Sequence, residues 1–174
     1  MKGVFWKEGE PFTNSMSLIV SLLLRYPEIA TLKLDPEEKS ILFTFMFSRR
    51  LTPMEIKELR ALLWTNLEAL HAISQNEPEI LKISIKCLYD LSLLEIKRDT
   101  ITLCQEEIAL LLGIIKEKHA EELITDQDEE MGEDELIFQE EMIGHMLEDL
   151  RDSGQEKKLI GIREEGRVMI FNRS

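Results

Sequence analysis

The sequence predicts an α+β fold. It comprises an antiparallel sheet built from two strand–strand–helix units with helices packed on it, then an acidic C-terminal helical extension and a terminal β-hairpin. Two observations predict this class. Segments of alternating apolar residues occur in pairs separated by turn residues, and each pair precedes a segment with capping residues and helical apolar spacing. With 174 residues, 44% of them hydrophobic, the chain can bury a core of its own.

A buried helix is expected over residues 16–26. Thr13, Asn14 and Ser15 can each accept a hydrogen bond from the first free N–H groups of that helix. The apolar positions that follow cover most of the helix circumference, which indicates burial on nearly all sides. Pro27 then ends the helix.

The first hairpin is expected to pair residues 31–34 with residues 40–48 across a turn at 35–39. In the longer strand, phenylalanine occurs at every second position from Phe43 to Phe47. Because side chains alternate between the two faces of a strand, these three rings share one face. This aromatic row is the clearest core signal in the sequence.

A long amphipathic helix follows, from Pro53 to about Ser74. Thr52 and Glu55 have the spacing of a capping box, in which each side chain accepts from a backbone N–H of the other residue. Proline suits the first helical position because its missing N–H would have no partner there.

The second hairpin is expected to pair residues 81–87 with residues 91–97, and a further helix should follow it. Thr102 is expected to cap that helix, with Gln105 in the capping-box position, and the helix is expected to extend as far as Leu123.

Beyond this body the chain changes character. An acidic link at 125–135 leads to an amphipathic helix over 136–150, and β-branched residues on both sides of a turn predict a hairpin from residues 158–162 and 167–172. We therefore expect an α+β body over residues 1–124, and an acidic linker, helix and hairpin over 125–174 that pack on the body or on a second subunit.

The net charge of −13 is unevenly distributed. Residues 1–100 carry 13 basic and 14 acidic side chains, whereas residues 106–149 carry 16 acidic side chains and only two lysines. An acidic surface repels the phosphate backbone, so binding to nucleic acid is not expected.

A cytoplasmic location is expected. Two cysteines, Cys87 and Cys104, are too few for a disulfide framework and are read as small buried or half-exposed thiols, although a helix start could favour the thiolate of Cys104. The apolar segment 18–24 is too short to span a bilayer and lacks the features of a signal peptide. No membrane association is therefore expected.

Two histidine–glutamate pairs are the candidate metal ligands. His119 with Glu122, and His145 with Glu148, each place both groups on one helical face. If the two helices pack antiparallel, four ligands could meet around a metal ion. However, carboxylate-bridged di-iron sites need Glu before His and further inward-facing glutamates. His71 is read instead as a residue at a helix end.

The acidic link resembles a calcium loop in part. Asp126, Asp128 and Glu130 occupy the first, third and fifth positions of such a loop. The two most constrained positions fail, because Met131 replaces the turn glycine and Ile137 replaces the final glutamate. A solvated, self-repelling linker is the preferred interpretation.

The terminal hairpin is the only basic element. It carries five cationic residues, namely Lys157, Lys158, Arg163, Arg167 and Arg173. A helix followed by a basic hairpin superficially resembles a winged helix on DNA, but the helix here is acidic. Pairing of the hairpin with acidic helices of the same chain or of a second copy is the preferred interpretation.

The sequence contains no phosphate-binding glycine loop, nucleophile elbow or zinc-type spacing, and it identifies no catalytic residue and no cofactor. We therefore expect a non-catalytic interaction or regulatory protein that binds a protein partner or forms a homodimer. The alternative is a metal-dependent protein or enzyme that uses the acidic segment with His119 and His145.

Overall fold

The structure is a computed structural model that describes residues 4–5, 13–126, 132–152 and 157–173. Its seven strands form one sheet in the order β1-β7-β6-β2-β3-β5-β4. The strands are β1 (Val4–Phe5), β2 (Thr31–Asp35), β3 (Ser40–Phe47), β4 (Leu81–Leu88), β5 (Leu91–Asp99), β6 (Lys158–Glu164) and β7 (Arg167–Arg173). Neighbouring strands are antiparallel, except that β1 runs parallel to β7.

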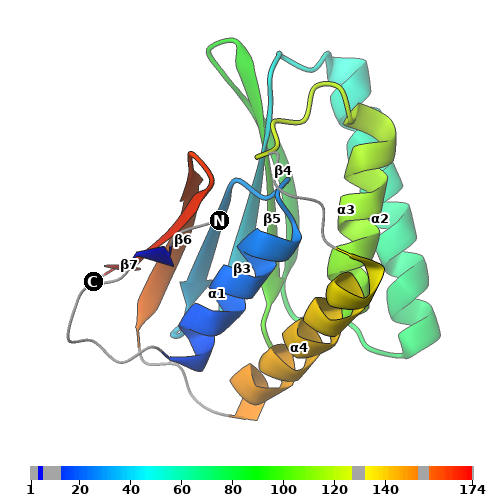
Figure 1. Ribbon diagram of the computed structural model, residues 1–174. Coiled ribbons are helices and arrows are strands. Elements are labelled where there is room, and N and C mark those ends of the chain that lie inside the picture. The colour runs from blue at the N-terminus through cyan, green and yellow to red at the C-terminus, as the bar shows by residue number, and fades with distance from the viewer. Residues whose placement is uncertain (1–3, 6–12, 127–131, 153–156, 174) are drawn as a thin grey trace.

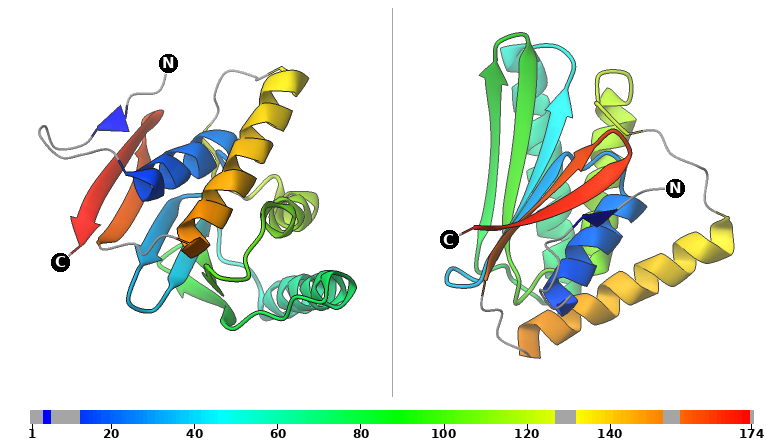
Figure 2. Two further views of the ribbon diagram at one scale, coloured as in Figure 1. Left: turned by 90° about the horizontal axis from the view of Figure 1, so that it is seen from below. Right: turned by 60° about the vertical axis from the view of Figure 1, so that its left-hand side comes forward.

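Four helices of the described chain form a layer on one side of this sheet (Figures 1 and 2). They are α1 (Asn14–Arg25), α2 (Pro53–Ser74), α3 (Gln105–His119) and α4 (Glu133–Asp152). Helices α1 and α2 contact the sheet, whereas α4 packs mainly on α1 and also touches α3. The α+β class predicted from the sequence is confirmed.

The sheet is larger than the four strands that the two predicted hairpins would supply. The terminal hairpin β6–β7 adds to it because β6 pairs with β2, through the register that joins Leu32 to Gly161 and Leu34 to Leu159. The predicted terminal hairpin is therefore present, and it extends the same sheet as the body of the chain (Figure 1).

Local capping explains where the first two helices begin. The Thr13 hydroxyl accepts a hydrogen bond from Met16 N–H at 3.2 Å, and α1 starts at Asn14, directly after Thr13. At α2 the capping box predicted for Thr52 and Glu55 is confirmed, since each side chain accepts from the backbone N–H of the other residue. Gln75, in the left-handed conformation with φ of 54°, caps the C-terminus of α2.

The prediction that Thr102 caps the third helix is wrong. Helix α3 begins two residues later, and its N-cap is Cys104, whose side chain makes no capping hydrogen bond. The Thr102 hydroxyl instead donates to Asp99 at 2.7 Å and accepts from Arg98 at 3.0 Å. The hydroxyl that was predicted to cap α3 is therefore used in side-chain hydrogen bonds with Asp99 and Arg98.

The core lies between the sheet and the helices. Phe43, Phe45 and Phe47 on β3 are at most 1% exposed, which confirms the face assigned to the aromatic row. Helix α3 ends at His119 rather than continuing to Leu123, which forms an isolated bridge with Phe47. The row is thus covered from the helical side and bordered by the chain that follows α3.

Helix α1 packs closely on β6 because Gly161 has no side chain. A Cβ atom placed on Gly161 would lie 2.2 Å from Cγ2 of Ile19 and 3.0 Å from Cδ1 of Leu23. Both of these α1 side chains are fully buried, so they cannot turn away into solvent. The glycine thereby determines how near α1 comes to the C-terminal hairpin.

We predict that Gly161→Ala lowers the free energy of unfolding by roughly 1–3 kcal/mol, because the new methyl group forces α1 away from the sheet. Urea unfolding followed by circular dichroism measures the change. Gly113→Ala is the control, since nothing lies within 4 Å of a Cβ at that exposed helical position. It should stabilise the protein by up to about 1 kcal/mol.

The steric explanation has its own test. The double variant Ile19→Ala/Gly161→Ala removes the methyl group that is closest to the new Cβ. The two substitutions should then destabilise less together than the sum of their separate effects. Additive effects would contradict a direct clash between residues 19 and 161.

Candidate functional site

The first predicted histidine–glutamate pair lies at the end of α3. His119 is buried and packs edge-on against the ring of Phe47, with centroids 5.6 Å apart. Its Nδ1 atom is 3.6 Å from Oε2 of Glu122. Glu122 also accepts a hydrogen bond from Arg49 at 2.9 Å, which is the main reason that its pKa is lowered. His119 is therefore held by its contact with Phe47, and Glu122 by its hydrogen bond with Arg49.

The second pair, His145 and Glu148, lies on α4, and both residues are exposed. Of the residues that the structure describes, no group of three or more histidine, cysteine, aspartate or glutamate side chains is placed to hold a metal ion. The structure therefore does not bring His119 and His145 together around one site.

The structure describes only part of the acidic segment. Residues 127–131, with most of the calcium-loop comparison, lie outside the described residues. Asp126 donates its backbone N–H to the Pro27 carbonyl at 3.1 Å. Glu133, Asp134 and Glu135 form the first turn of α4, where the partial positive charge of the helix N-terminus stabilises carboxylates.

The two cysteines occupy different environments. Cys87 is exposed on β4, and Cys104 is half-buried at the N-terminus of α3. Burial is the largest influence on Cys104 and raises the pKa of its thiol, so the thiol stays protonated near neutral pH. The helix terminus therefore does not create a thiolate nucleophile at this position.

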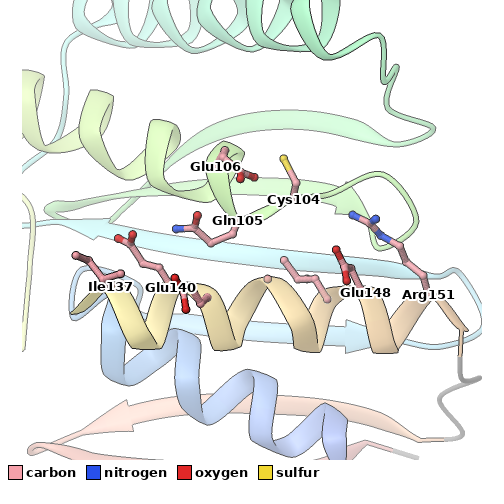
Figure 3. Close-up of a pocket in the computed structure, with 10 residues that line it drawn as sticks. Cys104, Gln105, Glu106, Ile137, Glu140, Glu148 and Arg151 are labelled. Carbon is pink, nitrogen blue, oxygen red and sulfur yellow. The ribbon is translucent and has the colours of Figure 1, made fainter. Parts of the chain in front are cut away.

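A cavity of about 300 Å³ lies between the start of α3 and one side of α4. Figure 3 shows Cys104 and Glu106 on one wall, and Glu140, Glu148 and Arg151 on the other. Arg151 donates to the Leu103 carbonyl at 2.5 Å, and Glu140 accepts from Arg25 at 2.6 Å. The lining of the cavity is mainly acidic. Arg151 and Glu140 use their charged groups to attach α4 to the residue before Cys104 and to α1.

A buried ionic cluster lies where β5 passes into α3. Arg98 is fully buried and donates to Glu107 through Nε at 2.5 Å and through Nη2 at 2.9 Å. Its Nη1 donates to Asp99 and to the Ile80 carbonyl. Both carboxylates are about 1% exposed. The guanidinium therefore has partners on β5, on α3 and at the start of β4.

Further partners complete the cluster. Nε2 of His71, near the end of α2, lies 2.6 Å from Oε1 of Glu107. Asp99 accepts from the backbone N–H groups of Glu79 and Ile80, each at 3.0 Å, and from Thr102. The charges are thus satisfied inside the protein, where unpaired ones would be costly. We assign this cluster to the fold rather than to a reaction.

Sequence reasoning missed the cluster, although one signal could have revealed it. Arg98 has the same parity as Leu94 and Ile96, which face the helices and are fully buried. A cation at a core-facing position needs a buried acid nearby. Glu107 meets that need from the first turn of α3.

Arg163 shows how the basic hairpin attaches to the body. Its Nη2 donates to the carbonyls of Leu23, Tyr26 and Ile29 around the end of α1. A cation at this place interacts favourably with the C-terminal end of the helix dipole. Lys158 lies 3.9 Å from Asp35 and 4.0 Å from Glu37. In these contacts the hairpin meets carbonyls and a turn rather than the acidic α4.

The sheet has a second face that no described helix covers (Figure 2). We call this the open face. By the strand register the large apolar side chains on it include these seven: Leu42, Met46, Leu93, Ile160, Ile162, Met169 and Phe171. Six are partly exposed, and Phe171 is 49% exposed. This is an extended, partly apolar surface made by β3, β5, β6 and β7.

The charges of the open face are mainly positive. The register places six basic residues on it, Lys33, Lys82, Lys86, Lys97, Lys158 and Arg167, together with the acids Asp35, Glu95 and Glu164. Lys86 pairs with Glu95 at 2.9 Å, and Lys97 pairs with Glu38 at 2.6 Å. Among the described residues, Lys33 and Lys82 have no acidic partner within ion-pair distance. In a chain with a net charge of −13, this face is locally basic.

Comparisons with protein-family models, with curated proteins and with solved structures find no match to this chain. Within the described residues, no helix combines the length and the apolar character that crossing a membrane requires. Inferences about function therefore rest on the surfaces and side chains described above.

We predict that Arg98→Met lowers the free energy of unfolding by roughly 3–5 kcal/mol, because it leaves Glu107 and Asp99 buried without their cation. Chemical unfolding measures the loss. Arg60→Met, at an exposed position on α2, is the matched control and should change stability little. Equal effects of the two substitutions would contradict the structural role of the cluster.

We also predict a contribution of Asp99 to acid stability. Burial tends to raise the pKa of Asp99, but hydrogen bonds from Ile80 and Thr102 and the charge of Arg98 outweigh burial and lower the pKa to about 2. A carboxyl whose pKa is 3.8 when unfolded and about 2 when folded stabilises the protein above pH 3.8, and this contribution is lost as the pH falls towards 2.

Unfolding measured between about pH 5 and pH 2 tests this linkage. The free energy of unfolding should fall less steeply with decreasing pH in Asp99→Asn than in the wild-type chain. Asp90→Asn removes one carboxylate from the exposed β4–β5 turn and controls for the change in net charge. An identical slope in Asp99→Asn and wild type would contradict the prediction.

Proposed function

We propose that this chain is a non-catalytic protein-interaction or regulatory protein and that the open face of its sheet is the binding surface. The observation that carries the proposal is the combination, on a sheet face that no described helix covers, of extended apolar area with lysines that have no acidic partner among the described residues. Binding of a partner to such a surface is favourable because it removes apolar atoms from water.

The layer arrangement supports this assignment. Antiparallel sheets with one solvated face commonly carry polar side chains on that face. Here Met46 lies opposite Leu93 on β3 and β5, and on β6 and β7 Ile160 lies opposite Phe171 and Ile162 opposite Met169. An apolar patch with a charged border is typical of a protein interface.

The charged residues support recognition rather than catalysis. The most deeply buried ionisable side chains, Arg98, Asp99 and Glu107, are paired with one another. The raised pKa of Cys104 keeps its thiol in the unreactive form. By contrast, Lys33 and Lys82 lie on the open face, where they can meet the carboxylates of an acidic partner.

A photo-crosslinking amino acid introduced at Phe171 or Leu42 tests the proposal. In cells that produce the full chain, illumination should yield discrete protein adducts from both positions, because a partner covers them. Mass spectrometry then identifies the captured protein, and a second copy of the chain counts as a partner.

The matched control is the same amino acid at Ile73, an apolar position on α2 that is 82% exposed but lies in the helical layer. Exposure alone would give adducts there as well. The proposal fails if the two open-face positions yield no adduct, or if the control position yields the same adducts.

A further inference from the structure

Helix α4 carries an exposed stripe that complements the open face. Phe138 is 61% exposed, Met142 is 42% exposed and Ile137 is 50% exposed. Phe138 and Met142 are four residues apart and therefore lie next to each other on one side of the helix. The buried side chains Ile143 and Leu147 occupy the other side, which packs in the helical layer. The stripe therefore stays exposed on the outer side of α4.

The surroundings of this stripe are acidic. Exposed carboxylates occur along α4 at Asp134, Glu135, Glu141 and Glu148, among others. The open face offers the opposite pattern, in which apolar residues are accompanied by six basic residues and three acids. Both surfaces thus combine apolar contact area with charge, and their charges are opposite in sign.

Resting on the function proposed above, we infer that the partner of the open face is a second copy of this chain, which presents the outer side of α4. The dimensions agree. A 20-residue helix is about 30 Å long, and a seven-stranded sheet is about 30 Å wide. The acidic helix can therefore lie across the lysines at one side of the sheet and place Phe138 on its apolar side chains.

Symmetric pairings of the same surfaces are electrostatically unfavourable. Two open faces brought together would oppose their lysines, and two α4 stripes would oppose their carboxylates. Only the pairing of helix with sheet brings unlike charges together. Because α4 belongs to the helical layer and the open face lies on the other side of the sheet, one molecule can engage two neighbours (Figures 1 and 2). Such a head-to-tail contact continues into a chain or closes into a ring.

Sedimentation velocity of the purified full-length chain tests the inference. The sedimentation coefficient of the wild type should rise with protein concentration and should fall towards the monomer value at high salt, where charge attraction is screened. A wild-type chain that remains monomeric at all concentrations would overturn the inference.

Two interface variants sharpen the test. The sheet variant Lys33→Glu/Lys82→Glu reverses two lysines that have no acidic partner among the described residues. The helix variant Phe138→Gln/Met142→Lys removes the exposed apolar stripe and adds a positive charge. Each variant alone should lose self-association. Lys57→Glu/Lys118→Glu reverses exposed lysines of the helical layer and should associate as the wild type does. Circular dichroism melting checks that every variant is folded.

Mixing the two interface variants distinguishes the head-to-tail arrangement from any symmetric one. The sheet variant retains its α4, and the helix variant retains its open face, so a mixture should form a 1:1 dimer that grows no further. A mixture that stays monomeric would overturn the inference. If the wild type is monomeric but Phe171 still crosslinks another protein, self-association fails while the proposed interaction function stands.

Discussion

The fold depends on a fully buried guanidinium. Arg98 is held by two hydrogen bonds from its side chain to Glu107 and by further ones to Asp99, Ile80 and Thr102. A buried cation is tolerated only when its donors are satisfied, so β5, α3 and the start of β4 must occupy one relative position. His71 links α2 to the same carboxylate. One ionic cluster thereby joins α2 and α3, the helices that follow the two hairpins, to the sheet.

This cluster also affects how the surface is interpreted. Because the buried charges are satisfied by one another, they provide no free acid or base within the core. The helices gather on one face of the sheet, and the opposite face keeps apolar side chains together with Lys33 and Lys82. The acidity that dominates the composition lies instead on α4 and its surroundings. The separation of charge along the sequence becomes a separation between two sides of the molecule, and the head-to-tail association that we propose rests on this polarity.

The sequence predicted best what is decided locally. The capping box of Thr52 and Glu55 depends on residues three apart, and the β3 phenylalanines follow the period of a strand. It predicted poorly where two possible hydrogen-bond partners compete for one side chain. Thr102 was assigned to a cap, but Arg98 and Asp99 use its hydroxyl. Spacing along a helix also does not reveal that His119 is buried while His145 is exposed.

The sequence by itself determined the α+β class, the start of α2, the core face of β3 and the uneven distribution of charge, because each follows from the chemistry of neighbouring residues. Only the tertiary structure decided that β6 pairs with β2, that α1 packs against Gly161 and that His71 of α2 contacts Glu107. It also decided which side of the sheet stays open. These features depend on contacts between residues far apart in the chain, whose free energies no local pattern records.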